Sequence, residues 1–245
     1  MDLQIGPAGN FYITDAGKKQ ASVTKPDGTA ISQTNTEPWT PHAAVPSAKG
    51  GMYVLLPWSQ KGLLHYDGSG IKTHTFNLNG TEMFLGEINE MFLVRGSSLF
   101  KYTLDTDFRP IKENKFSLPD TSQSKIVTAA MGPDNMTHVL SGDAKLYTLD
   151  TSMAEYNRVA IDPQAVSSSS KLAVDHKGRY YITDLFNNKI HVFDKEGNRL
   201  LGSSEHSNCP IDISSPIDIL FWNKQLYVLN KENNLFNVTV IKITE

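Results

Sequence analysis

Short runs of aromatic and β-branched residues alternate along the chain with polar turn segments at a regular interval. Each run is centred on an aromatic residue or a histidine, and these centres are Tyr12, Tyr53, Phe92, His138, Tyr181 and Tyr227. The successive spacings between them are 41, 39, 46, 43 and 46 residues. A repeat of this length is typical of the blades of a β-propeller. The 245 residues therefore divide into six units.

Each central run has a further predicted strand on either side. The preceding strands are short and rich in small residues, and they cover Leu3 to Ile5, Ala43 to Val45, Met83 to Leu85, Val127 to Ala129, Leu172 to Val174 and Ile217 to Leu220. The following strands cover Ala21 to Thr24, Leu63 to Tyr66, Leu99 to Tyr102, Leu146 to Leu149, Ile190 to Phe193 and Val238 to Ile243. Turns of the Asp-Gly type then lead to a weak fourth strand. Because no long stretch has helical periodicity, the pattern predicts an all-β, six-bladed β-propeller with mostly four-stranded antiparallel blades.

We expect one propeller domain that covers residues 1–245. Its approximate blades are 1–38, 39–79, 80–118, 119–163, 164–205 and 206–245. The sixth unit stops after its third predicted strand. Either the last blade has three strands, or residues upstream of Met1 supply the fourth; we favour the second, because such closure would hide an exposed sheet edge.

The fifth unit carries the most specific motif of the chain. Residues 171–197 begin with Lys171-Leu172-Ala173-Val174-Asp175-His176-Lys177-Gly178-Arg179-Tyr180-Tyr181-Ile182-Thr183-Asp184 and continue through Asn188-Lys189-Ile190-His191-Val192-Phe193 to Gly197. This stretch closely resembles an NHL repeat. The first and sixth units resemble it more loosely, and the other three keep only the strand rhythm.

Several families share this resemblance, so it implies an architecture and not one function. They include exported bacterial binding propellers, streptogramin lyases, gluconolactonase-like hydrolases, amidating lyases and RNA-binding regulators of animals. The Trp-Asp dipeptide of another large propeller class is missing, since Trp39, Trp58 and Trp222 are followed by Thr, Ser and Asn. A repeated Gly-Gly pair of the kelch type is missing as well.

Composition narrows the classes of partner. The formal net charge is −3, and the 23 Lys and Arg residues form no cluster of five or more, which argues against nucleic acid as a partner. The apolar runs are too short for insertion into a membrane. Cys209 is the only cysteine, so neither an intramolecular disulfide nor a cysteine-based zinc site is expected. We expect a monomer and favour an exported location, periplasmic or extracellular, with the targeting segment outside this sequence.

Residues that are unique to one blade are the candidates for a binding site. The segment before the innermost strand and the loop after the second strand lie on the same rim of a propeller. Five non-repeated residues occupy such positions in the second and third units: Trp39, His42, Trp58, Glu82 and Arg95. Together they could form an amphipathic patch for a sugar ring or a peptide. The alternative is that Trp39 and Trp58 wedge between blades.

Polar residues that recur at equivalent positions of several units indicate a shared structural role. Asp15, Asp184 and Asn230 follow the second strand of their units, where a short polar side chain can hydrogen-bond the next turn. The alternative is a ring of ligands: with Glu82 they could imitate the Ca or Mg site that a gluconolactonase-like enzyme requires. His42 with Glu82 could imitate the His and Glu pair of a streptogramin lyase. Four other histidines are expected to be satisfied residues on strand faces: His65, His74, His138 and His191.

The sequence thus predicts a non-catalytic scaffold without a cofactor, which recognises a protein segment or a glycan at its rim. The alternative is a metal-assisted lyase or lactone hydrolase with an axial Ca or Mg ion.

Overall fold

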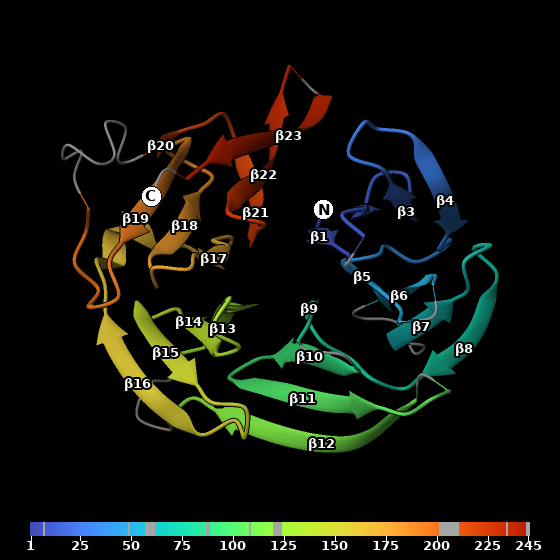
Figure 1. Cartoon of the computed structure of the whole chain (residues 1–245), viewed down its shortest axis with the longest axis horizontal. Coiled ribbons are helices and arrows are strands. Elements are labelled where there is room, and N and C mark those ends of the chain that lie inside the picture. The colour runs from blue at the N-terminus through green and yellow to red at the C-terminus, as the bar shows by residue number, and fades with distance from the viewer. Residues whose placement is uncertain are drawn as a thin grey trace. The chain divides into compact units, whose positions relative to one another are not determined.

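The computed structural model describes residues 1–6, 8–48, 50–56, 62–86, 89–107, 109–119, 124–200, 211–233 and 235–243. These residues form six antiparallel sheets that follow one another along the chain, five with four strands and one with three (Figure 1). The predicted six-bladed β-propeller fold with mostly four-stranded blades is therefore confirmed. Trp58 and Cys209 lie outside the described residues. No helix among the described residues is long and apolar enough to cross a membrane.

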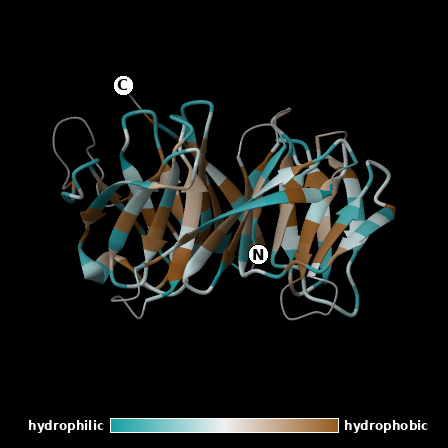
Figure 2. Ribbon diagram, turned by 90° about the horizontal axis from the view of Figure 1, so that it is seen from below, coloured by the Kyte–Doolittle hydropathy of each residue, from teal (hydrophilic) through white to brown (hydrophobic). Residues whose placement is uncertain are grey.

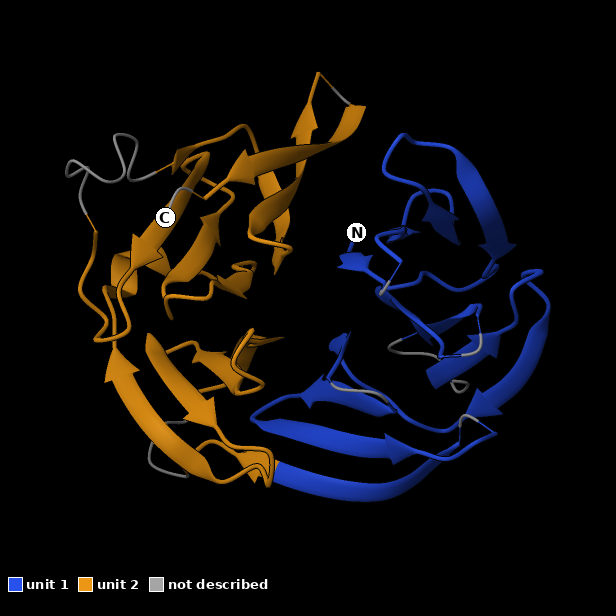
Figure 3. Cartoon of the chain, viewed as in Figure 1, with its two compact units in different colours: residues 1–115 blue, residues 116–245 orange. Residues whose placement is uncertain are grey.

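The chain divides into two compact units, Met1–Lys115 and Phe116–Glu245 (Figure 3). The first unit contains three sheets. The first sheet consists of β1 (Leu3–Ile5), β2 (Phe11–Asp15), β3 (Gln20–Thr24) and β4 (Ala30–Asn35). The second consists of β5 (Ala43–Pro46), β6 (Met52–Leu56), β7 (Gly62–Tyr66) and β8 (Lys72–Phe76). The third consists of β9 (Glu82–Leu85), β10 (Glu90–Arg95), β11 (Ser98–Leu104) and β12 (Pro110–Ser117), whose last two residues belong to the second unit.

The second unit contains the other three sheets and one short helix. The fourth sheet consists of β13 (Ile126–Met131), β14 (Thr137–Ser141), β15 (Lys145–Leu149) and β16 (Glu155–Ala160). The 3₁₀ helix η2 (Pro163–Ala165) follows it. The fifth sheet consists of β17 (Leu172–Val174), β18 (Tyr180–Asp184), β19 (Lys189–Phe193) and β20 (Ile211–Asp212), and the sixth of β21 (Pro216–Trp222), β22 (Gln225–Glu232) and β23 (Leu235–Lys242).

The six central residues of the sequence repeat occupy equivalent places. Each lies in the second strand of its sheet and pairs with a residue of the third strand. The pairs are Tyr12 with Val23, Tyr53 with His65, Phe92 with Lys101, His138 with Thr148, Tyr181 with Val192 and Tyr227 with Val240. The predicted alignment of the repeat is confirmed.

Alternating side chains of one strand contribute to two different hydrophobic clusters. In β18, Tyr180 and Ile182 pack in a cluster with residues of the fourth sheet such as Leu140 and Leu146. Tyr181 points to the other face and packs with β21 and β22. Successive side chains of a strand point to opposite faces, so the middle sheet of each unit, the second and the fifth, is covered on both sides. Figure 2 shows hydrophobic residues concentrated in the strands and hydrophilic residues in the connecting loops.

An aspartate organises the turn that follows the third strand in four sheets. Its Oδ1 atom accepts hydrogen bonds from the backbone N–H groups two and four residues later. These aspartates are Asp67, Asp105, Asp150 and Asp194. Because one short side chain satisfies two backbone donors, the same five-residue turn recurs between strands of very different sequence.

The sixth sheet differs from the others at its outer edge. In the described part of the chain it has three strands, and β1 pairs with β2 in the first sheet. The prediction that the last blade receives three strands from these residues is confirmed. Closure by residues upstream of Met1 stays a prediction.

Candidate functional site

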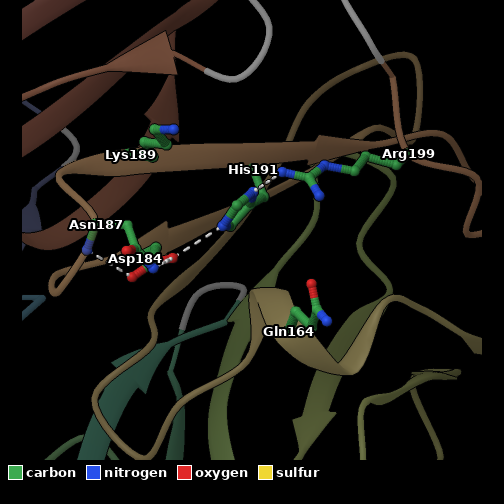
Figure 4. A pocket seen from close by; sticks show the side chains of 6 residues that line it. All are labelled: Gln164, Asp184, Asn187, Lys189, His191 and Arg199. Carbon is green, nitrogen blue, oxygen red and sulfur yellow. Dashed lines mark hydrogen bonds and ion pairs between the residues drawn. The ribbon is translucent and has the colours of Figure 1, made fainter.

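The second unit contains a polar pocket of about 220 Å³ beside the fifth sheet. Its lining comes from three places along the chain: η2, the β18–β19 hairpin, and the segment after β19. The lining residues are Gln164, Asp184, Asn187, Lys189, His191 and Arg199 (Figure 4). The segment that leads into the innermost strand and the turn after the second strand thus meet at one pocket, as the topology predicted for the rim.

The register of the sheet gathers the charged side chains on one face. Asp184 at the end of β18 pairs with Lys189 at the start of β19, and Ile182 pairs with His191. Residues two apart in a strand share a face, so Asp184, Lys189 and His191 project to the same side. This is the side on which Ile182 packs against the fourth sheet.

A chain of hydrogen bonds holds His191 in place (Figure 4). Its Nε2 atom lies 3.0 Å from Asp184 Oδ2, and its Nδ1 atom lies 2.8 Å from Arg199 Nη2. Arg199 Nη1 donates to Asp162 Oδ2 at 3.2 Å. A guanidinium can only donate, so Nδ1 must accept, and the ring is the neutral tautomer that donates through Nε2 to Asp184.

Asp184 is also tied to the next turn. The backbone N–H of Asn187 donates to Oδ1 at 3.0 Å, and the Asn187 side-chain amide donates to Oδ2 at 2.7 Å. Burial alone would raise the pKa of Asp184, but the hydrogen bonds from Asn187 and His191 outweigh it and hold the pKa below its usual value. The carboxylate is therefore ionised, and three hydrogen bonds occupy most of its acceptor sites.

The predicted hydrogen bond to the next turn is present for two of the three repeated polar residues. Asp15 Oδ1 accepts from the backbone N–H of Lys18 at 3.0 Å, three residues later, as Asp184 does from Asn187. Asn230 behaves differently, because its Oδ1 accepts from the Thr239 hydroxyl on the neighbouring strand β23.

His42 and Arg95 lie at the predicted positions, His42 in the segment before an innermost strand and Arg95 at the end of a second strand. His42 precedes β5; its backbone N–H donates to Leu55 at the end of β6, and its carbonyl accepts from Thr14. Arg95 ends β10, is exposed, and donates through Nε to the Asn79 carbonyl before β9. Its guanidinium also lies 4.9 Å from the centre of the Phe100 ring.

Trp39 and Glu82 are less accessible to solvent than Arg95. Trp39 is half-buried and packs against a cluster that contains Tyr12, Met52 and Tyr66. This contact fits the alternative in which Trp39 wedges between blades. Glu82 lies in β9, pairs with Val94, and is 8% exposed. The contribution of Trp58 remains a prediction, because it lies outside the described residues.

The alternative metal ligands are distributed over both units. Asp15 and Glu82 belong to the first unit, and Asp184 and Asn230 belong to the second. Among the described residues, no group of three or more His, Cys, Asp or Glu side chains could hold a metal ion.

The histidines within strands have polar partners as predicted, except that the buried Nε2 atom of His138 accepts or donates no hydrogen bond within the described residues. His65 contacts Ser47 and Thr73, and His191 contacts Asp184 and Arg199. His138 contacts Thr148 and lies 3.6 Å from Asp134. His74 lies 3.1 Å from the Thr73 hydroxyl.

Sequence reasoning missed most of the pocket. It placed Asp184 as a turn residue and His191 as a satisfied strand residue, but it did not bring them together with Arg199 and Gln164. One signal was present: His191 is unique to its blade, since Ser22, Leu64, Phe100, Tyr147 and Thr239 occupy the equivalent register positions. No local pattern distinguishes Gln164 or Arg199.

The chain is similar to solved propeller structures. No family model matches it, and no curated protein matches it. The crystal structure of virginiamycin B lyase from Staphylococcus aureus is 14% identical with a TM-score of 0.62, over 99% of this chain and 84% of the lyase. A streptogramin B lyase structure is 12% identical with a TM-score of 0.63, over 100% of this chain and 83% of that chain. BamB from Moraxella catarrhalis is 11% identical with a TM-score of 0.57, over 93% of this chain and 81% of BamB. At these identities the likeness shows the fold alone, and the class that the fold defines is the six-bladed β-propeller.

Proposed function

We propose that this chain is a non-catalytic β-propeller that recognises a segment of another protein at its rim. The observation that carries the proposal is the position of His191 between Asp184 and Arg199, at the border of an open polar pocket. Both ring nitrogens are engaged, so the imidazole is held as a rigid part of the pocket wall. We infer that the fifth blade is NHL-like in sequence and that this wall is its most specialised part.

Binding explains this arrangement better than acid–base catalysis. A general base needs a nitrogen or oxygen within reach of the proton that it removes. His191 Nδ1 already accepts from Arg199, and both oxygens of Asp184 accept from Asn187 or His191. The pocket instead presents donors, which suits recognition of an acceptor group on a partner.

The non-repeated residues of the second and third blades remain part of the proposal. Arg95 is exposed and partly stacked on Phe100, so it is available as a contact at that rim. We propose that the contact surface around Arg95 binds a protein segment or a glycan. Its other members would be Trp39, His42, Trp58 and Glu82.

The second candidate function is a metal-assisted lyase or lactone hydrolase. The Asp184–His191 pair at 3.0 Å favours it, because such a pair can move a proton once His191 is released from Arg199. Likeness of fold to virginiamycin B lyase also supports it. Asp15, Glu82, Asp184 and Asn230 would then be tested as ligands of Ca or Mg.

Measurements of binding, metal content and turnover on the purified chain separate the two functions. Peptides selected from a displayed random library should bind with reproducible sequence preferences, while a glycan array tests the other ligand class. Metal content should stay well below one Ca or Mg per chain after exchange into metal-containing buffer. Stoichiometric metal together with turnover of lactones or cyclic esters would overturn the binding proposal. Light scattering should give a monomer.

A further inference from the structure

The pocket beside the fifth sheet has more hydrogen-bond donors than acceptors. Asp184 supplies the carboxylate of the lining, and its two oxygens already accept three hydrogen bonds, two from Asn187 and one from His191. The remaining charged lining residues are Lys189 and Arg199. With His191 neutral, the lining carries two positive charges against one negative charge, and the charge of Arg199 is paired with Asp162 beside the pocket.

Two of these donors have capacity for a ligand. A guanidinium has five N–H donors, and Arg199 directs one to His191 and one to Asp162. Lys189 is half-buried, and its side-chain ammonium has no hydrogen bond or ion pair within the part of the chain that the structure describes. A cation without a partner at the wall of a pocket favours an anionic acceptor there.

The size of the pocket limits what that acceptor can belong to. At about 220 Å³ it is smaller than the roughly 300–1,000 Å³ typical of pockets that enclose a whole drug-sized molecule. It has room for one side chain. Phe186, on the same β18–β19 turn, is 76% exposed and could contact the residues on either side of an inserted group.

We propose that this pocket binds the carboxylate of an aspartate or glutamate side chain from a protein segment, with Lys189 and Arg199 as its donors. The inference rests on the proposed function and adds the chemical group that is recognised. His191 is a positioning residue in this arrangement, because it holds Arg199 through Nδ1 while Asp184 fixes its ring through Nε2.

The test uses the whole chain, labelled with ¹⁵N, and two capped amino acids as probes. N-acetyl-glutamate N-methylamide should shift the amide resonances of Asn187, Lys189 and His191 in a saturable manner, and N-acetyl-glutamine N-methylamide should not. Lys189→Gln should lower the affinity for the glutamate compound roughly fivefold or more, whereas Lys189→Arg should keep most of that affinity. Lys195→Gln is the matched control, since Lys195 lies on the same blade with 70% of its side chain exposed; it should bind as the wild type does.

Several results would overturn the inference. Equal shifts with the glutamine compound would show that charge is not recognised, and unchanged binding by Lys189→Gln would exclude Lys189 as a donor. Tighter binding of inorganic phosphate at the same amides would overturn the carboxylate assignment. Selected peptides that bind without an acidic residue would overturn this inference and leave the proposed function intact. The proposed function fails separately if no peptide is selected while the glutamate compound still binds.

Discussion

Asp175 and Arg179 form a buried ion pair at the inner hairpin of the fifth blade. Asp175 Oδ2 lies 2.6 Å from Arg179 Nε and 2.5 Å from Nη2, and the two side chains are 0% and 8% exposed. The Tyr181 hydroxyl donates to the same oxygen at 3.1 Å. Oδ1 accepts from the backbone N–H groups of Lys177 and Arg179. One carboxylate therefore closes the hairpin and also neutralises a buried guanidinium.

Removal of this carboxylate is expected to cost far more stability than removal of an equivalent exposed one. Asp175→Ala leaves the charge of Arg179 buried without its partner, so we expect the free energy of unfolding to fall by about 3–5 kcal/mol. Asp67→Ala is the matched control, because Asp67 makes the same two backbone hydrogen bonds in an exposed turn. Its expected cost is about 1 kcal/mol. Urea denaturation at pH 7 measures both, and equal losses would contradict the role assigned to the ion pair.

The adjacent glycines of the β5–β6 hairpin are expected to respond differently to alanine. Both have positive φ, 87° at Gly50 and 84° at Gly51. A Cβ atom at Gly50 would meet nothing within 4 Å, whereas one at Gly51 would lie 2.2 Å from the Tyr66 carbonyl oxygen. Gly50→Ala should therefore cost about 1 kcal/mol from backbone strain, and Gly51→Ala about 3 kcal/mol or more, because the backbone at Tyr66 must also move away from residue 51. Thermal unfolding of the two variants tests this, and similar melting temperatures would contradict it.

The contribution of Asp184 to stability should depend on pH. Its pKa in the folded chain lies below the usual 3.8, so the folded state favours the ionised carboxylate. The resulting stabilisation is fully present above about pH 3.8 and is lost as the pH falls through the lower, folded-state pKa. Asp184→Asn should destabilise the chain by about 1–3 kcal/mol at pH 7. Urea denaturation at several pH values measures the difference in the free energy of unfolding between Asp184→Asn and the wild type. This difference should become smaller below pH 4. A difference independent of pH would show that the charge of Asp184 does not contribute to stability.

Trp39 is expected to contribute mainly to stability. The indole is half-buried against residues of the first two sheets, including Tyr12 and Met52, so Trp39→Ala removes packing contacts. We expect a loss of about 2–3 kcal/mol, below the range for a fully buried tryptophan. Chemical denaturation measures the loss, and binding of the selected peptides is the parallel assay. Full stability together with lost peptide binding would instead place Trp39 in the recognition surface.

Local patterns in the sequence were sufficient to predict the strands and their order. Tyr12 and Tyr181 lie 169 positions apart, yet each occupies the same register position in its sheet, as the spacing of the repeat predicted. The reason is that alternation of side chains and the chemistry of tight turns act over fewer than ten residues. The turn hydrogen bonds of Asp15 and Asp184 could be predicted for the same reason.

The pocket depends on contacts between segments that no local pattern relates. Arg199 meets Asp162 across 37 positions, and Gln164 reaches the same cavity from η2. These contacts exist because the fifth sheet packs one face against the fourth, which brings η2 beside the β18–β19 hairpin. The sequence by itself determined the six repeating units, although it assigned Ile211–Asp212, which pair with β19 in the fifth sheet, to the sixth unit. Only the packing of one blade on the next decided that Asp162 and Gln164 would meet Arg199 at a common site, because side chains on separate elements become neighbours through burial of the apolar residues between them.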